Sequence, residues 1–125
     1  MSAVRTFEDL LVWKKSHELV LMVYRETDQY PKQEIFGLVS QTRRSAVSVS
    51  ANIVEGFRRN RTRDSLNFYR ISDASLEETK YHLMLAHDLH YISDESYRLL
   101  KQKSEEVGRL LNGWMKSQTF PSPQT

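Results

Sequence analysis

Apolar residues recur at alternating steps of three and four along four separate stretches of the chain. This spacing places them on one face of an α-helix, and no stretch shows the period-two alternation of a half-buried strand. The predicted helices cover about residues 7–29, 33–59, 63–90 and 94–117. Because only short loops separate them, the pattern predicts an all-α protein, an antiparallel up-down-up-down four-helix bundle formed by residues 1–117.

Start and stop signals support these helix boundaries. Thr6 can cap the first helix, with Asp9 reaching back from three residues on, and Pro31 disfavours helix in the residue before it. Ser93 can cap the fourth helix. Residues 118–125 lack helical periodicity and hold two of the three prolines of the chain, so we expect a flexible C-terminal tail.

The second predicted helix carries a stripe of hydrogen-bonding side chains beside its apolar face. They recur at steps of three and four, which aligns them along one side of a helix. The stripe consists of Gln41, Arg44, Ser48, Asn52 and Glu55. A helix with an apolar face and a continuous polar stripe usually lies where several helices meet. We therefore interpret the stripe as a satisfied internal network that fixes helix register, with a ligand site as the alternative.

Composition favours one small domain without catalytic chemistry. The chain has 125 residues, 39% of them hydrophobic, and no cysteine, which excludes disulfides and thiolate metal sites. No glutamate is followed three residues later by a histidine, as a di-iron bundle requires, and His87 with His90 is too small a set for a defined metal site. Neither a Gly-x-Ser-x-Gly elbow nor a glycine-rich phosphate loop occurs. We expect no enzyme activity, no metal and no cofactor.

The hydropathy of the chain gives no membrane signal. No apolar run approaches the roughly 18 residues that a membrane-spanning helix needs. The acids Glu8 and Asp9 interrupt the N-terminal stretch, which lacks the layout of a signal peptide. We therefore expect a cytoplasmic protein.

Positive charge gathers in the middle of the chain. Residues 31–63 hold seven basic and two acidic residues, although the net charge of the whole chain is only +2. Six of these basic residues are arginines: Arg43, Arg44, Arg58, Arg59, Arg61 and Arg63. The last four flank the predicted corner between the second and third helices, where guanidinium groups can bind phosphate oxygens in a bidentate manner.

Two points about these arginines stay open at the level of sequence. Arg43 and Arg44 either join the four corner arginines or lock the polar stripe. The corner itself is either a nucleic-acid-binding surface or a solvated corner whose arginines pair with Asp64 and with acids of the next helix. Assembly of several copies around an axis would multiply the charge and favour nucleic-acid binding.

Several motifs resemble one known family. Residues 41–56 match the signature Q-x-R-R-x-x-x-S-x-x-x-N-I-x-E-G of the four-helix-bundle proteins encoded within bacterial 23S rRNA intervening sequences. The matching residues are Gln41, Arg43, Arg44, Ser48, Asn52, Ile53, Glu55 and Gly56. Residues 7–13, 31–38 and 75–78 resemble the family's F-x-D-L-x-V-W, P-x-x-E-x-x-G-L and S-L-x-E segments. The similarity covers about residues 7–115, with a departure at Asp73-Ala74, where the family often has a run of small residues.

The resemblance implies a bundle that assembles as a ring-shaped homo-oligomer, commonly a pentamer. A related branch, the accessory variability determinants of diversity-generating retroelements, binds nucleic acid and partners a reverse transcriptase. We therefore predict a non-enzymatic oligomeric bundle protein that binds RNA or DNA through phosphate contacts at its arginine-rich corner. The alternative is an oligomeric scaffold whose surface recruits a partner protein such as a polymerase.

Overall fold

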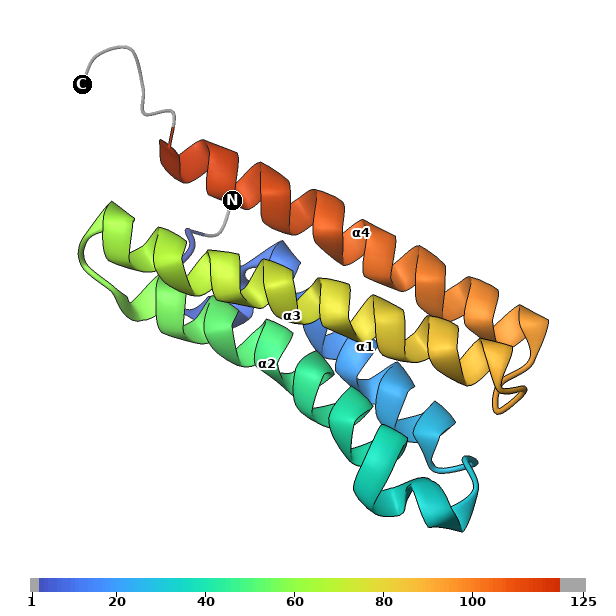
Figure 1. The fold of residues 1–125 in the computed structure, drawn as a ribbon. Coiled ribbons are helices and arrows are strands. Elements are labelled where there is room, and N and C mark those ends of the chain that lie inside the picture. The colour runs from blue at the N-terminus through green and yellow to red at the C-terminus, as the bar shows by residue number, and fades with distance from the viewer. Residues whose placement is uncertain (1–2, 120–125) are drawn as a thin grey trace.

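The computed structural model describes residues 3–119, which form four long α-helices and no strand (Figure 1). The helices are α1 (Leu11–Thr27), α2 (Ser40–Arg58), α3 (Thr62–Asp88) and α4 (Asp94–Thr119). Each helix packs against the next one along the chain, and α1 also contacts α4, which closes the bundle. Figure 1 shows α3 lying between α2 and α4. The predicted all-α four-helix fold is confirmed.

Aliphatic side chains fill the space between the four helices. Each helix contributes completely buried residues from the apolar face that its sequence predicts. The largest of them is Tyr69, and the aliphatic ones are Leu19, Val23, Val49, Ile53, Leu76, Leu83, Leu100, Val107 and Leu111. Burying one such side chain contributes roughly 1.5–3 kcal/mol. The four apolar faces therefore account for the packing of the bundle.

The predicted first helix is interrupted near its start. Phe7–Asp9 forms one turn of 3-10 helix, and Leu10 after it is extended, with φ −77° and ψ 124°. One carboxylate oxygen of Asp9 accepts hydrogen bonds from the backbone N–H groups of Arg5, at 2.9 Å, and Thr6, at 3.1 Å, which holds this turn. The extended step brings Leu10 into the core, where it is buried.

The second predicted helix, 33–59, is a regular α-helix only from Ser40. Before it, Lys32–Glu34 forms a 3-10 turn and Ile35–Val39 forms a π-helical turn. Within the π-helical turn Gly37 has a non-helical backbone, with φ −112° and ψ −110°. The chain therefore bends at residues 35–39, within the stretch that the sequence predicts as one continuous second helix.

Glu34 holds this bend in place. Its Oε1 accepts a hydrogen bond from the backbone N–H of Leu38 at 3.2 Å, and its Oε2 accepts one from the Tyr91 hydroxyl at 2.7 Å. These bonds, the one from Tyr91 first, hold the pKa of the Glu34 carboxyl below its ordinary value. A Cβ atom on Gly37 would lie only 2.9 Å from Oε1, so the glycine leaves room for the carboxylate.

Small hydroxyl side chains line the buried contact between α2 and α3. Ser72 Oγ donates to the carbonyl oxygen of Val49 at 2.7 Å, and Thr79 Oγ1 donates to Ser45 Oγ at 2.8 Å. Ser45 Oγ also lies 3.3 Å from Nδ1 of His82, which is buried. Because each hydroxyl finds a partner inside the bundle, the two helices can approach closely without leaving these buried polar atoms unsatisfied.

The third helix ends at Asp88, two residues before the predicted end. His90 follows in the left-handed region, with φ 65°. The N–H of Tyr91 then donates to the carbonyl oxygen of Ala86 at 2.8 Å. In a Schellman motif, which terminates a helix, the residue after the left-handed position donates this backbone hydrogen bond.

The fourth helix extends past its predicted end at residue 117. It continues to Thr119, so the first two residues of the predicted flexible tail are helical. The rest of that tail, 120–125, lies outside the described residues. No helix within residues 3–119 is long and apolar enough to cross a membrane.

Candidate nucleic-acid interface

The arginines predicted to contact nucleic acid surround the connection between α2 and α3. Arg58 is the last residue of α2, Arg63 is the second residue of α3, and Arg59 and Arg61 between them have extended backbones. All four side chains are exposed. Figure 1 shows this connection at one end of the bundle. We call these four residues the arginine corner.

Helix electrostatics do not explain this concentration of positive charge. Arg58 lies at the C-terminal end of α2, where a cation interacts favourably with the helix dipole. Arg61 and Arg63 lie at the N-terminal end of α3, where the dipole disfavours a cation. Arg61 and Arg63 therefore occupy positions where the helix dipole disfavours positive charge. An arginine at such a position can serve to bind an external anion.

Arg59 is the only corner arginine that has an ion-pair partner within residues 3–119. Its Nη2 donates to Oε2 of Glu55 at 2.7 Å, and its guanidinium carbon lies 4.5 Å from the centroid of the Phe68 ring. The two charged side chains are 43% and 53% exposed, so the pair contributes only about 0–1 kcal/mol to stability. These contacts hold the guanidinium at a defined position across the corner.

The other three corner arginines keep their charge available. Arg58, Arg61 and Arg63 form no ion pair with any residue that the structure describes, and Asp64 forms none either. The pairing with Asp64 expected under the alternative interpretation is therefore not formed. A cluster of exposed, unpaired guanidinium groups is an electrostatic footprint for a polyanion.

A fifth arginine, Arg5, lies beside the arginine corner although it is distant from the corner in sequence. Together with Arg58 and Arg59, Arg5 lines a groove of about 560 Å³ between residues 5–8 and the end of α2. The hydrogen bonds to Asp9, from the Arg5 N–H first, lower the pKa of the Asp9 carboxyl and hold this segment. Sequence reasoning missed Arg5 because no local pattern connects it with the corner.

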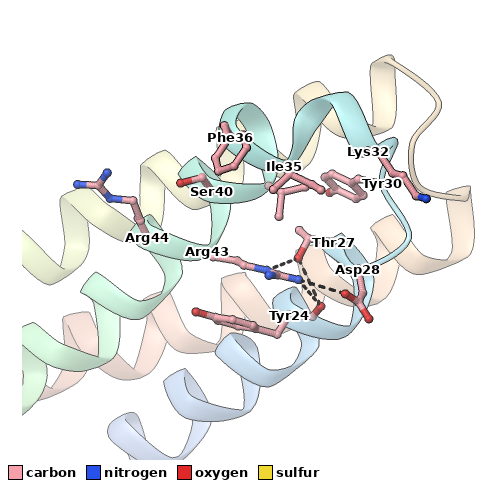
Figure 2. A pocket seen from close by; sticks show the side chains of 11 residues that line it. Tyr24, Thr27, Asp28, Tyr30, Lys32, Ile35, Phe36, Ser40, Arg43 and Arg44 are labelled. Atoms are coloured by element: carbon pink, nitrogen blue, oxygen red, sulfur yellow. Dashed lines mark hydrogen bonds and ion pairs between the residues drawn. The ribbon is translucent and has the colours of Figure 1, made fainter.

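Arg43 does not belong to the corner. Its Nε donates to Thr27 Oγ1 at 2.9 Å, and its Nη2 donates to the carbonyl oxygen of Tyr24 at 3.3 Å (Figure 2). Its Nη2 lies 3.6 Å from an oxygen of Asp28, and its guanidinium carbon lies 4.5 Å from the centroid of the Tyr24 ring. A cation at the last carbonyl groups of a helix is favourable. Arg43 thus fastens α2 to the C-terminal end of α1 and lies apart from the four corner arginines.

Arg44 is also separate from the corner. Its side chain is exposed, and Figure 2 shows it pointing away from Arg43. Arg44 precedes Arg58 on the same helix by fourteen residues, which corresponds to about 21 Å at the rise of an α-helix. Of the two positions left open for Arg44, the structure does not place it with the four corner arginines, because α2 (Ser40–Arg58) keeps its two arginine-rich ends apart.

The polar stripe of α2 is not an internal network. Gln41, Arg44 and Glu55 are exposed, and Ser48 and Asn52 are half-buried. Asn52 Nδ2 donates to the carbonyl oxygen of Ser48 at 2.9 Å and to its hydroxyl at 3.0 Å, both within the same helix. Among the described residues, the side chain of Glu55 bonds to Arg59 of the arginine corner. The interpretation of the stripe as an internal network is therefore corrected.

The rotation of α2 about its axis explains this correction. Ser45 and Val49 meet α3 in the interior, whereas Ser48 reaches α3 only at the edge, through a 2.7 Å hydrogen bond to Ser75. Neighbouring stripes of a helix share the same three-four spacing, so the spacing alone does not decide which stripe lies inside. The stripe that the sequence singles out is an outer face of α2.

The histidines form no metal centre within residues 3–119. That part of the chain has no group of three or more metal-ligating side chains. His87 instead lies 2.7 Å from Asp94, atom Nε2 to Oδ1, and its ring stacks on Tyr97 with a centroid separation of 4.3 Å. His87 therefore packs the connection between α3 and α4.

These features define a class of protein, a small four-helix bundle with an arginine-rich corner. The family follows from the sequence. Residues 8–113 match the model of the family described as 23S rRNA-intervening sequence protein. The match spans most of the chain, and the chain belongs to this family, which confirms the resemblance seen in its motifs.

A solved structure supports the same fold. The chain is similar to the crystal structure, at 1.70 Å resolution, of a protein with unknown function from the S23 ribosomal protein family of Bacteroides thetaiotaomicron VPI-5482. The two chains share 29% sequence identity with a TM-score of 0.77, over 86% of this chain and 100% of the other. No curated protein matches the chain.

Proposed function

We propose that this protein binds RNA or DNA through phosphate contacts at the arginine corner, without catalysing a reaction and without a cofactor. The observation that carries the proposal is the exposure of Arg58, Arg61 and Arg63, which lack an ion-pair partner among residues 3–119. Each guanidinium can donate two parallel hydrogen bonds to phosphate oxygens. Phosphate contacts carry no sequence information, so the binding is independent of base sequence. The family name refers to an intervening sequence of 23S rRNA, which makes RNA the first ligand to test.

We also propose that the protein assembles as a ring-shaped homo-oligomer of five subunits. Phe36, on the turn before α2, is 96% exposed, and Ile35 beside it is 50% exposed (Figure 2). Apolar side chains left in water favour coverage by another chain. In a ring the arginine corners repeat around the axis, so several corners can contact one nucleic acid and the overall affinity exceeds that of a single corner.

We propose in addition that consecutive helices within each subunit are antiparallel. The contacts between α2 and α3 support opposite directions, because Ser45 meets Thr79 while the later residue Val49 meets the earlier residue Ser72. Short connections between consecutive helices support the same arrangement.

The test is the affinity for a blunt-ended, fully paired RNA duplex across a salt series, measured by fluorescence anisotropy. The logarithm of the binding constant should fall linearly with the logarithm of the salt concentration, by about 0.9 for each duplex phosphate contacted. Replacing all four corner arginines with glutamine should remove most of the affinity and flatten this dependence. Circular dichroism should show unchanged helicity, because these side chains are exposed.

A matched control removes the same amount of charge elsewhere. Its four glutamine substitutions replace Arg25, Arg98, Lys101 and Arg109, which are exposed and form no ion pair with the described residues. This variant should retain most of the affinity. Equal losses in the two variants would show that net charge alone matters, and no binding at low salt would contradict the proposal.

A second candidate function is a scaffold that recruits a polymerase such as a reverse transcriptase. A groove of about 280 Å³ between α3 and α4 is lined by Tyr81, 55% exposed, and Met84, 44% exposed. Exposed apolar side chains at a groove are a common site of protein association. If this is the function, Met84→Glu should abolish capture of a purified reverse transcriptase after nuclease treatment. The variant without corner arginines should still capture it.

A further inference from the structure

The groove beside Arg5 has a defined shape that phosphate binding alone does not require. It lies between residues 5–8 and the end of α2, and its volume is about 560 Å³. Pockets for small ligands span about 300–1,000 Å³, so one nucleotide fits in it. The Asp9 carboxylate holds one wall by accepting two backbone hydrogen bonds, from Arg5 at 2.9 Å and Thr6 at 3.1 Å. The wall is therefore in place before any ligand binds.

Two guanidinium groups and two aromatic rings line this groove. Arg5 and Arg58 are exposed, and neither has an ion-pair partner among the residues described. Phe7 and Phe57 are half-buried and line the same groove, so part of each residue stays open to solvent. Asn60 adds an amide group that can both donate and accept hydrogen bonds.

The carboxylates at this site leave it positive. Glu8 and Glu55 also line the groove. Glu55 is bonded to Arg59 at 2.7 Å, so its charge is already compensated. Among the residues that line the groove, Glu8 is the one carboxylate without an arginine partner, and Arg5 and Arg58 outnumber it. The groove thus joins positive charge to aromatic surface, the combination found in proteins that bind single-stranded nucleic acid.

We propose that this groove binds one unpaired nucleotide of an RNA whose backbone lies on the arginine corner. The base stacks on Phe7, and Arg5 and Arg58 bind the adjoining phosphates. A base inside a duplex is stacked on its neighbours and does not enter, so the site selects loops, bulges and single-stranded ends. This inference rests on the proposed function and deepens it, because phosphate contacts alone give no such preference.

The test compares a blunt-ended, fully paired RNA duplex with the same duplex carrying a short single-stranded 3′ overhang. Fluorescence anisotropy at one salt concentration should show roughly tenfold tighter binding of the overhang RNA, an increase within the range that stacking of one base provides. Phe7→Leu should remove this preference and leave the affinity for the blunt-ended duplex unchanged. Phe7→Tyr, which keeps an aromatic ring, should retain the preference.

The control variant is Tyr81→Leu, which removes a 55% exposed aromatic ring of α3 outside the groove and should keep the preference. Thermal melts of all variants show whether each is folded. Equal affinity of the parent protein for the two RNAs would overturn the groove proposal while leaving the phosphate contacts at the corner in place. Failure to bind even the blunt-ended duplex at low salt would overturn both proposals.

A second measurement locates the base directly. A 4-thiouridine in the overhang should cross-link on irradiation to peptides containing residues 5–8 or 57–60. Cross-links confined to other helices would overturn the assignment, whatever the affinities show.

Discussion

A Cβ atom built on Gly56 would lie 2.5 Å from Cε1 of the Tyr69 ring. It would also lie 3.0 Å from the backbone carbonyl oxygen of Ser65. No side chain fits in that space, so α2 and α3 meet closely here because position 56 is a glycine. Tyr69 is almost fully buried. This contact sets the distance between the two helices next to the arginine corner.

Substitution of Gly56 tests that contact. Gly56→Ala should lower the free energy of unfolding by about 1–3 kcal/mol, because overpacking outweighs the roughly 1 kcal/mol that alanine adds in helix propensity. Gly113→Ala is the matched control, since nothing lies within 4 Å of its added Cβ, and it should be neutral or slightly stabilising. Urea unfolding followed by circular dichroism measures both. Equal stabilisation by the two substitutions would contradict the close contact.

Arg43→Gln should destabilise the fold without weakening RNA binding. The substitution removes charged hydrogen bonds to Thr27 and to the carbonyl oxygen of Tyr24, at a cost of about 1–2 kcal/mol. Arg44→Gln, its exposed neighbour, should change stability by no more than about 0.5 kcal/mol. Thermal melts and RNA anisotropy distinguish the two effects. An affinity loss comparable to that of the corner variant would return Arg43 to the binding surface.

Stability should fall between pH 7 and pH 5 because of His82. Burial lowers the pKa of this histidine from its ordinary 6.5, although Glu78, 3.7 Å away, acts in the opposite direction. Above the ordinary value the histidine is neutral in both states. As the pH falls below it, the unfolded chain binds a proton more readily than the folded one, so stability is lost toward and through the lower folded pKa.

The measurement is urea unfolding at pH 7.5 and pH 5.5 for the parent protein and for His82→Gln. The parent should lose more stability on acidification than the variant does. Glu34 and Asp9 also have lowered pKa values. The stability that these two carboxylates contribute is lost only at more acidic pH, where they become protonated. An identical pH dependence in the two proteins would show that His82 does not cause the loss.

Phe36→Ser should weaken assembly and leave the subunit folded. The side chain is 96% exposed, so its removal changes the stability of one chain by no more than about 0.5 kcal/mol. Light scattering after size-exclusion chromatography should give a smaller particle than for the parent protein. Ile71→Ser, at a site 49% exposed within α3, is the control and should leave the assembly intact. A parent protein that is monomeric at micromolar concentration would contradict the assembly itself.

The sequence by itself determined the helices and the place of the corner. Apolar periodicity is a local property, so Leu19, Ile53 and Leu83 could be assigned to the core before any packing was known. Arg58 and Arg63 are close in sequence and flank a predicted loop, so their common position also follows locally. Motifs shared with the family could be identified for the same reason.

The tertiary structure decided which distant residues meet. The late start of α2 depends on the hydrogen bond from Tyr91 to Glu34, two residues that no local pattern connects. Arg43 could have joined the corner by its type and charge, and only the position of Thr27 on α1 shows that it fastens two helices. Arg5 joins the corner through the folding of the N-terminal segment across the end of α2.

The rotation of each helix was likewise decided by packing. Ser45 and Ser48 belong to stripes with the same spacing, yet only Ser45 is buried against Thr79. Periodicity specifies that one face of a helix is buried, but the partner helices determine how far that face extends to either side. The elements therefore followed from local chemistry, whereas the hydrogen-bond partners and the groove depended on contacts between segments that are far apart in the chain.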